Sequence, residues 1–146
     1  MGEKQWLSLF FFLFFHAMMK MNVWKWRDYM THAHITSWLI AIILFLIAVS
    51  LQRSGSAKAK MVQMVLRLFY IITIITGVLL LHSLASLSIL YVIKTLAGLW
   101  VIGAMEMVLM AMKKGKSTAV AWVQWVVALV LVLFLGLMLP LGIDLF

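Results

Sequence analysis

Four ionisable side chains lie inside long apolar stretches of this sequence: Arg67, His82, Lys94 and Glu106. In a hydrocarbon environment charged groups are costly, so such residues are the first candidates for function. Arg67 lies about one helical turn inside the start of its stretch, and Glu106 about two turns from the end of its own. Similar depths predict an interhelical Arg67–Glu106 ion pair. We expect it to neutralise both charges and fix packing, and a role in transport is the alternative.

A second polar group gathers at the other ends of the stretches. His82 and Lys94 flank an uncharged turn, and His32 and His34 precede the first stretch. Imidazole nitrogens and an ammonium at one level could bind a metal, a haem propionate or a quinone oxygen. His32 and His34 are two positions apart and do not share a helix face. The candidate cofactor-binding residues are therefore His34, His82 and Lys94, and solvation at an interface would satisfy them equally well.

Other chemistry is excluded by the residues that are missing. The chain has no cysteine, so disulfides, thiolate metal sites and cysteine catalysis are ruled out. Gly115-Lys116-Ser117 resembles the end of a phosphate-binding loop, but Met110 occupies the position of the required earlier glycine. The motifs H-E-x-x-H and G-x-S-x-G are also missing. The sequence therefore predicts no catalytic residue and no metal site.

The elements that must position these side chains are four apolar stretches, at about 35–51, 64–86, 87–112 and 120–139. Of the 146 residues, 66% are hydrophobic and 11% charged, whereas a soluble domain has about 25% charged residues. A helix of ~20 apolar residues crosses a bilayer. Short connectors make neighbouring helices antiparallel. The sequence predicts an all-α, integral membrane, up-down bundle of four transmembrane helices.

Positive charges fall on alternate connectors only. The connectors after the first and third stretches carry Arg53, Lys58, Lys60, Lys113, Lys114 and Lys116. Basic loops stay in the cytoplasm, near anionic lipid head groups. We therefore expect a multi-pass protein of the bacterial cell membrane with both termini outside. Half of the 12 lysines and arginines lie in these short loops beside apolar spans, so the net charge of +8 does not indicate nucleic-acid binding.

Residues 1–29 differ from the rest. Their apolar run, Trp6–Met19, is short for a span, and the basic residues at 20–27 would lie outside, against the positive-inside rule. The peptide before Met30 can be encoded with a GGAGG ribosome-binding sequence. We expect the native protein to start at Met30, with 30–146 as the transmembrane domain and the extension poorly packed against it.

Small and aromatic side chains give further expectations about packing. Thr73 and Gly77 lie on one face of the second stretch. The third stretch also contains small residues: Ala97, Gly98, Gly103 and Ala104. Such faces allow close approach, so we expect the second and third helices to pack through them, with homodimerisation as the alternative. An aromatic belt at the membrane boundaries is expected from Trp38, Tyr91, Trp122 and Trp125.

From Met30 onward the sequence resembles the YisL family of small uncharacterised membrane proteins of Gram-positive bacteria. The segments that carry the resemblance are MTHAHITSW at 30–38, SGSAK at 54–58, LRLFYIITIITG at 66–77, MEM at 105–107, KKGKST at 113–118 and LPLGIDLF at 139–146. The resemblance implies a four-span plasma-membrane protein and no particular activity. The extra 29 residues depart from the family pattern.

Three functions remain open at this point. The first is a non-enzymatic accessory or structural membrane component, acting as a homo-oligomer or within a larger membrane complex. The second is a haem- or quinone-binding redox bundle that uses His34, His82 and Lys94. The third is a small oligomeric transporter that uses Arg67 and Glu106.

Overall fold

The regular elements of the chain are helices throughout the part that the structure describes, a computed structural model covering residues 2–20, 23–83 and 88–138. The helices are α1 (Glu3–Lys20), α2 (Val23–Arg53), α3 (Lys58–His82), α4 (Ile89–Lys113) and α5 (Ala119–Met138). In this described part, α2 to α5 are long and apolar enough to cross a membrane. The predicted all-α bundle with four helices of spanning length is confirmed.

The helices extend beyond the apolar stretches at several ends. α2 begins at Val23 and α3 at Lys58, where the sequence analysis placed the span starts at 35 and 64. Hydropathy marks only the residues suited to hydrocarbon, whereas helical hydrogen bonds continue into a polar environment. Residues 84–87 and 139–146 lie outside the described residues. They include the centre of the uncharged turn between His82 and Lys94 and the segment LPLGIDLF at 139–146.

Two glycines reverse the chain after α2 and α4. Gly55 and Gly115 have φ angles of 67° and 68°, in the left-handed region that a side chain disfavours. After each glycine, the next backbone amide donates a hydrogen bond to a helix carbonyl five residues earlier. Ser56 donates to Leu51 at 3.1 Å, and Lys116 donates to Ala111 at 2.9 Å. This is the Schellman ending, which satisfies free carbonyls. Both basic connectors are thus tight turns.

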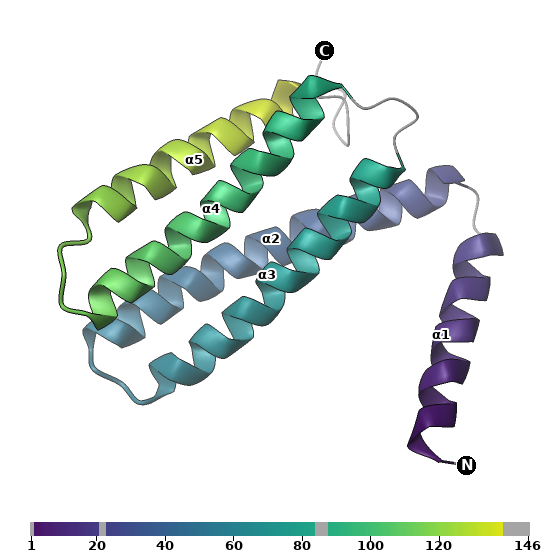
Figure 1. Cartoon of the computed structure of the whole chain (residues 1–146), viewed down its shortest axis with the longest axis horizontal. Coiled ribbons are helices and arrows are strands. Elements are labelled where there is room, and N and C mark those ends of the chain that lie inside the picture. The colour runs from purple at the N-terminus through teal and green to yellow at the C-terminus, as the bar shows by residue number, and fades with distance from the viewer. Residues whose placement is uncertain (1, 21–22, 84–87, 139–146) are drawn as a thin grey trace.

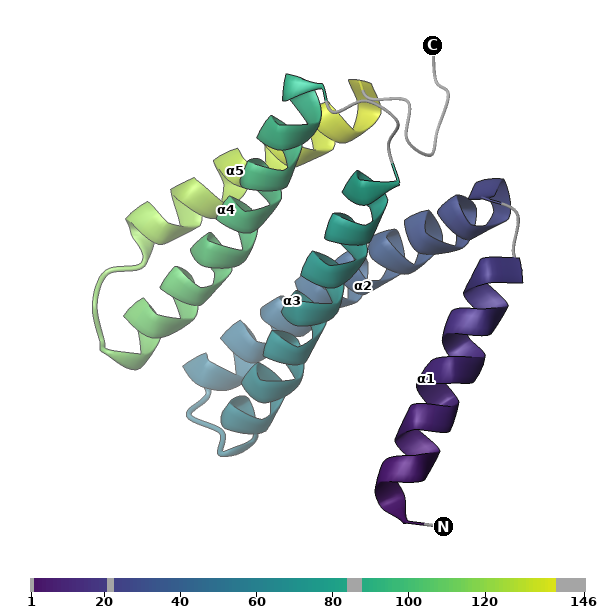
Figure 2. The same ribbon diagram turned by 45° about the vertical axis from the view of Figure 1, so that its right-hand side comes forward.

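The four long helices form two antiparallel hairpins. α2 packs along α3, and α4 along α5, while α4 makes smaller contacts with α2 and α3 (Figures 1 and 2). The connectors at 54–57 and 114–118 lie at the same end of the bundle (Figure 1). The end of α3 and the starts of α2 and α4 lie at the other end. The two basic connectors, which are separated along the sequence by an uncharged turn, thus lie together at one end of the bundle.

An aromatic cluster joins the hairpins in the core. Phe45 of α2 is fully buried, and its ring lies 5.6 Å from that of Trp122 and 5.2 Å from that of Trp125, between centroids. The two tryptophans of α5 meet edge to face at 5.5 Å. Trp122 and Trp125 therefore pack against Phe45 in the core, and their place in a boundary belt stays a prediction. Tilted and edge-to-face ring contacts of this kind are favourable beyond the apolar area that they bury.

The small face of α3 packs on α2, so the expectation that it packs on α4 is wrong. The Thr73 hydroxyl donates to Ser37 Oγ at 3.3 Å, and a Cβ added to Gly77 would lie 3.2 Å from His34 Cε1. On α4, Gly98 and Gly103 have open space around them. α3 approaches α2 closely where hydrogen bonds join the two helices. The positions of the small residues in the sequence did not reveal these bonds.

α1 lies apart from the other helices in both views (Figures 1 and 2). Its side chains are exposed wherever their burial is described, including the phenylalanines at 10–12. The start of the native protein at Met30 stays a prediction, because helical structure on both sides of this residue does not test it.

Candidate functional site

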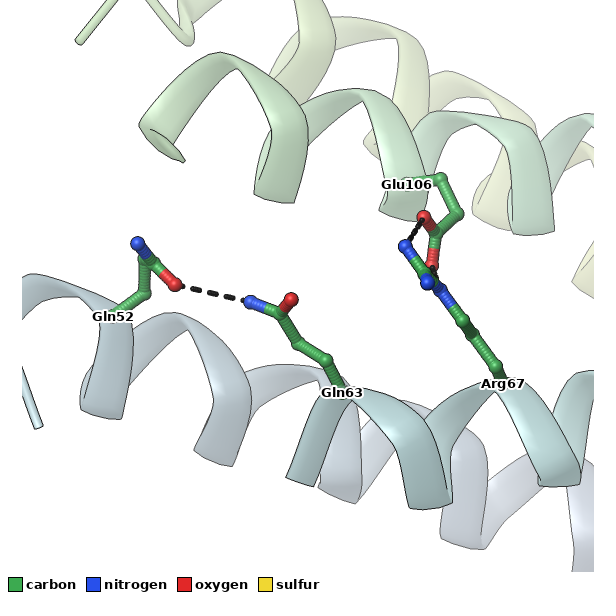
Figure 3. A network of polar contacts seen from close by, with 4 residues as sticks. All are labelled: Gln52, Gln63, Arg67 and Glu106. Atoms are coloured by element: carbon green, nitrogen blue, oxygen red, sulfur yellow. Dashed lines mark hydrogen bonds and ion pairs between the residues drawn. The ribbon is translucent and has the colours of Figure 1, made fainter. Parts of the chain in front are cut away.

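The predicted Arg67–Glu106 pair is present and links α3 to α4. Arg67 Nε lies 3.4 Å from Glu106 Oε1, and Arg67 Nη2 lies 3.1 Å from Glu106 Oε2. Two parallel bonds of this kind hold a carboxylate in a fixed orientation (Figure 3). The Arg67 side chain is 60% exposed and that of Glu106 25%. Because α3 and α4 belong to different hairpins, the pair fixes one hairpin against the other.

A pair of glutamines extends this polar row towards the charged connectors. Gln63 Nε2 donates to Gln52 Oε1 at 3.0 Å, which joins α3 to the end of α2 (Figure 3). Gln63 is buried and lies four residues before Arg67, so both side chains share a face of α3. Gln63 was not predicted as a site residue, because residues 52–63 lie outside the apolar stretches and were expected to form a connector. An uncharged polar residue between apolar neighbours was the available signal.

Tyr70 adds a phenol next to the ion pair. Its side chain is buried, and its hydroxyl has no hydrogen-bond partner among the described residues. The hydroxyl is close enough to Glu106 and Arg67 for their charges to act on it. Tyr70 was not among the predicted site residues, since a tyrosine in an apolar helix carries no distinct signal in the sequence. Tyr70 and Arg67 of α3 and Glu106 of α4 thus form a polar patch between the two helices.

The second polar group is centred on His34 of α2. His34 Nδ1 lies 3.0 Å from Thr76 Oγ1 and 3.1 Å from the Thr73 carbonyl oxygen. A carbonyl only accepts, so this arrangement assigns the ring proton to Nδ1 and leaves Nε2 as the acceptor. The Thr76 hydroxyl in turn donates to carbonyls of its own helix. Gly77 leaves room for the imidazole against α3.

A short chain of hydroxyls continues from this histidine. Thr73 donates to Ser37 at 3.3 Å, and the Ser37 hydroxyl donates to the His34 carbonyl at 3.0 Å. Ser37 and Thr73 are both buried. Since each hydroxyl proton has an acceptor, these residues can remain in an apolar interior without large cost.

The three candidate cofactor-binding residues share no hydrogen bond in the part of the chain that the structure describes, and two of them, His34 and Lys94, lie within range of charge interaction. Lys94 of α4 is half-buried and close enough to His34 for its charge to act on the imidazole. His82 is exposed at the end of α3, and no contact with the other two is found within the described ranges. His32 is exposed as well. The described residues contain no group of three or more histidine, aspartate or glutamate side chains that could hold a metal ion.

The chain is similar to a known family of proteins. The profile of a family described as "Protein of unknown function (DUF1516)" matches residues 31–136. The chain is 78% identical over 117 residues to a UPF0344 protein of Geobacillus sp. (strain WCH70), an alignment that covers 80% of this chain and 100% of the relative.

More distant relatives align over a similar length. The UPF0344 protein of Anoxybacillus flavithermus is 55% identical over 117 residues, 80% of this chain and 99% of its own. The UPF0344 protein YisL of Bacillus subtilis (strain 168) is 49% identical over 118 residues, 80% of this chain and 100% of its own. No solved structure matches the chain.

Proposed function

The chain belongs to the YisL family, whose profile is described as a protein of unknown function (DUF1516), and we propose that it is a non-enzymatic accessory or structural component of the bacterial cell membrane. In this role it spans the membrane four times and presents its outer surface to lipid and to partner proteins. The proposal includes self-association or assembly into a larger membrane complex.

The observation that carries this proposal is the pairing of Arg67 with Glu106. Both oxygens of the Glu106 carboxylate are held by the Arg67 guanidinium of the opposite helix. A transport path needs charged groups that turn towards a ligand, whereas a bidentate pair fixes the helices that carry it. His34 is likewise bonded to α3 through Nδ1. This use of polar groups for packing supports a structural component over a transporter.

The outer faces of the helices support membrane placement. Large apolar side chains are exposed on the helices, and examples are Ile71, Ile75, Val123, Val130 and Leu137, each more than half exposed. A soluble monomer rarely exposes such continuous apolar surface. In the hydrocarbon of a bilayer, these side chains no longer contact water, so their exposure is not costly. Each helix also satisfies its own backbone hydrogen bonds there.

The sidedness follows from the charged connectors. Both lie at one end of the bundle (Figure 1), and their lysines and arginines favour the cytoplasm. This orientation places the start of α2 and the end of α5 on the outer side. Anionic lipid head groups of the inner leaflet are then the neighbours of the two turns.

Cysteine labelling tests this arrangement, because the chain has no cysteine of its own. Single substitutions at exposed turn positions serve as probes: Ser54→Cys, Ser88→Cys and Lys116→Cys. In intact cells a membrane-impermeant maleimide should label only Ser88→Cys. The other two should react after permeabilisation. Labelling of Ser54→Cys in intact cells would contradict the sidedness, and extraction of the chain by alkaline carbonate would contradict membrane integration.

A redox bundle remains the second candidate, and one observation favours it. Lys94 stands near His34 with no hydrogen-bond partner among the described residues, and the His34 Nε2 is left as an acceptor. A quinone oxygen or a haem propionate would suit the ammonium. The absorption spectrum of the detergent-purified chain tests this candidate, in the visible range for haem and in the ultraviolet range of an organic extract for a quinone. A chromophore lost in His34→Ala would support it and would contradict the purely structural role.

A further inference from the structure

A hollow of about 190 Å³ lies between α3 and α4, towards the end of the bundle that carries the basic connectors. Its α3 side consists of Gln63 and Arg67. The α4 side consists of Glu106, Leu109, Met110, Lys113 and Lys114. α3 and α4 come from different hairpins and touch each other much less than the two helices within a hairpin do. The incomplete contact between hairpins leaves this space, which we name the basic hollow.

The charges around the basic hollow favour an anion. Three cations, from Arg67, Lys113 and Lys114, surround the single carboxylate of Glu106, which leaves an excess of two positive charges. The carboxylate is already neutralised by its two bonds to Arg67. The negative end of the α4 dipole is equivalent to only about half a charge, so the two lysines outweigh it.

Unused hydrogen-bond donors point to the kind of anion. A guanidinium has five N–H groups, and Arg67 uses two of them on Glu106, so three remain for a ligand. Lys113, the last residue of α4, and Lys114, its C-cap, each offer an ammonium on an exposed side chain. Several donors around one small space suit the multiple oxygens of a phosphate group better than a halide ion.

Apolar surface beside the donors indicates an amphipathic ligand. Leu109 and Met110 line the hollow together with the charged groups. Met110 is 48% exposed, and Met64 and Leu68, the sequence neighbours of the α3 wall, are also exposed. Met110 lines the hollow itself, and Met64 and Leu68 add exposed apolar surface on α3 at the same depth. A free inorganic anion would gain nothing from them, whereas an acyl chain would.

From this arrangement we propose that the basic hollow binds the phosphate group of an anionic phospholipid. The phosphate oxygens accept from Lys113, Lys114 and the free N–H groups of Arg67, and the acyl chains lie along the exposed methionines. The proposal rests on the membrane placement proposed above. Inorganic phosphate carries the same chemistry without the acyl chains, so the test must separate the two sources.

The test uses the full chain in detergent and native mass spectrometry with three probes: phosphatidylglycerol, phosphatidylcholine and inorganic phosphate. We expect a retained phosphatidylglycerol adduct and no comparable phosphatidylcholine adduct. The double variant Lys113→Gln/Lys114→Gln should weaken phosphatidylglycerol binding about tenfold or more. Both lysines are exposed, and circular dichroism should confirm an unchanged helix content.

The matched control is Lys58→Gln/Lys60→Gln, which removes the same charge at the same end of the bundle but outside the hollow. Its effect should stay within about threefold, because only general attraction is lost. Equal losses in the two double variants, or equal binding of phosphatidylcholine, would overturn the proposal. Inorganic phosphate that binds as tightly as phosphatidylglycerol and is lost with Lys113→Gln/Lys114→Gln would support the phosphate site and assign it to the free anion.

Cysteine labelling and lipid binding together distinguish failure of the lipid site from failure of the proposed membrane placement. Correct cysteine labelling together with equal losses in the two variants would remove the lipid site alone. Incorrect labelling, or carbonate extraction, would remove the membrane placement whatever the lipid result.

Discussion

Arg67 and Glu106 are 39 residues apart in sequence and bond to each other through both oxygens of the carboxylate. Their exposure is unequal, since the arginine side chain is 60% exposed and the glutamate 25%. A long arginine side chain can carry its charge towards a polar interface, but a glutamate on the inner face of α4 has less reach. The two members of the pair therefore do not contribute symmetrically to stability.

Removing the arginine should cost more than removing the glutamate. Arg67→Gln leaves the Glu106 carboxylate without a partner between apolar helices, at a cost of about 1–3 kcal/mol. Glu106→Gln leaves an arginine that can reach the polar interface, so its cost should stay below about 1 kcal/mol. The double variant should be more stable than Arg67→Gln alone. Denaturant unfolding of all three variants in one detergent measures this coupling, and additive losses would contradict it.

The contact between His34 and Gly77 predicts a position-dependent effect of alanine. A methyl group at Gly77 would lie 3.2 Å from His34 Cε1, and the imidazole is held in place by Thr76. Gly77→Ala should therefore lower stability by about 1 kcal/mol or more relative to alanine at an open glycine.

The controls for this prediction are Gly98→Ala and Gly103→Ala, which have open space around the added methyl group. Both should be neutral or gain up to about 1 kcal/mol from helix propensity. In a His34→Ala background, Gly77→Ala should behave like these controls. Thermal unfolding in one detergent provides the measurement, and an unchanged penalty without the imidazole would show that the contact is not the cause.

Phe45 should be the most sensitive position in the core. Its ring is fully buried between Trp122 and Trp125 and joins α2 to α5. Phe45→Ala should cost on the order of 3–5 kcal/mol, from lost contacts and the cavity that remains. Phe134→Ala removes the same atoms from a position that is 58% exposed, so its cost should be below about 1 kcal/mol. Similar losses at the two positions would contradict this account of the core.

Much of the fold could be predicted because it depends on composition and spacing. Four apolar stretches with short connectors predict four antiparallel helices, and similar depths in two stretches predict the Arg67–Glu106 pair. These inferences need only the rise per residue and the cost of an isolated charge. They do not depend on the rotation of any helix about its own axis.

The remaining features depend on that rotation and could not be read from the sequence. Thr73 and Gly77 form a face of small side chains, and such a face can pack against any neighbouring helix. The hydrogen bond from Thr73 to Ser37 determines that this neighbour is α2. Trp122 and Trp125 lie near a predicted boundary, yet they turn inwards onto Phe45. Sequence position gives the depth of a residue in a span, whereas the direction of its side chain comes from packing.

Removing α1 tests how far the bundle depends on its first helix. The described side chains of α1 are exposed, and the helix lies apart from the hairpins (Figure 2). The chain without residues 1–22 should therefore keep its thermal midpoint to within about 2 °C, since no core contact is lost. Circular dichroism should show a loss of helix signal that corresponds to the 18 residues of α1 and no more. A larger loss of helix signal, or a fall of more than about 5 °C, would mean that α1 packs on the hairpins in the membrane environment.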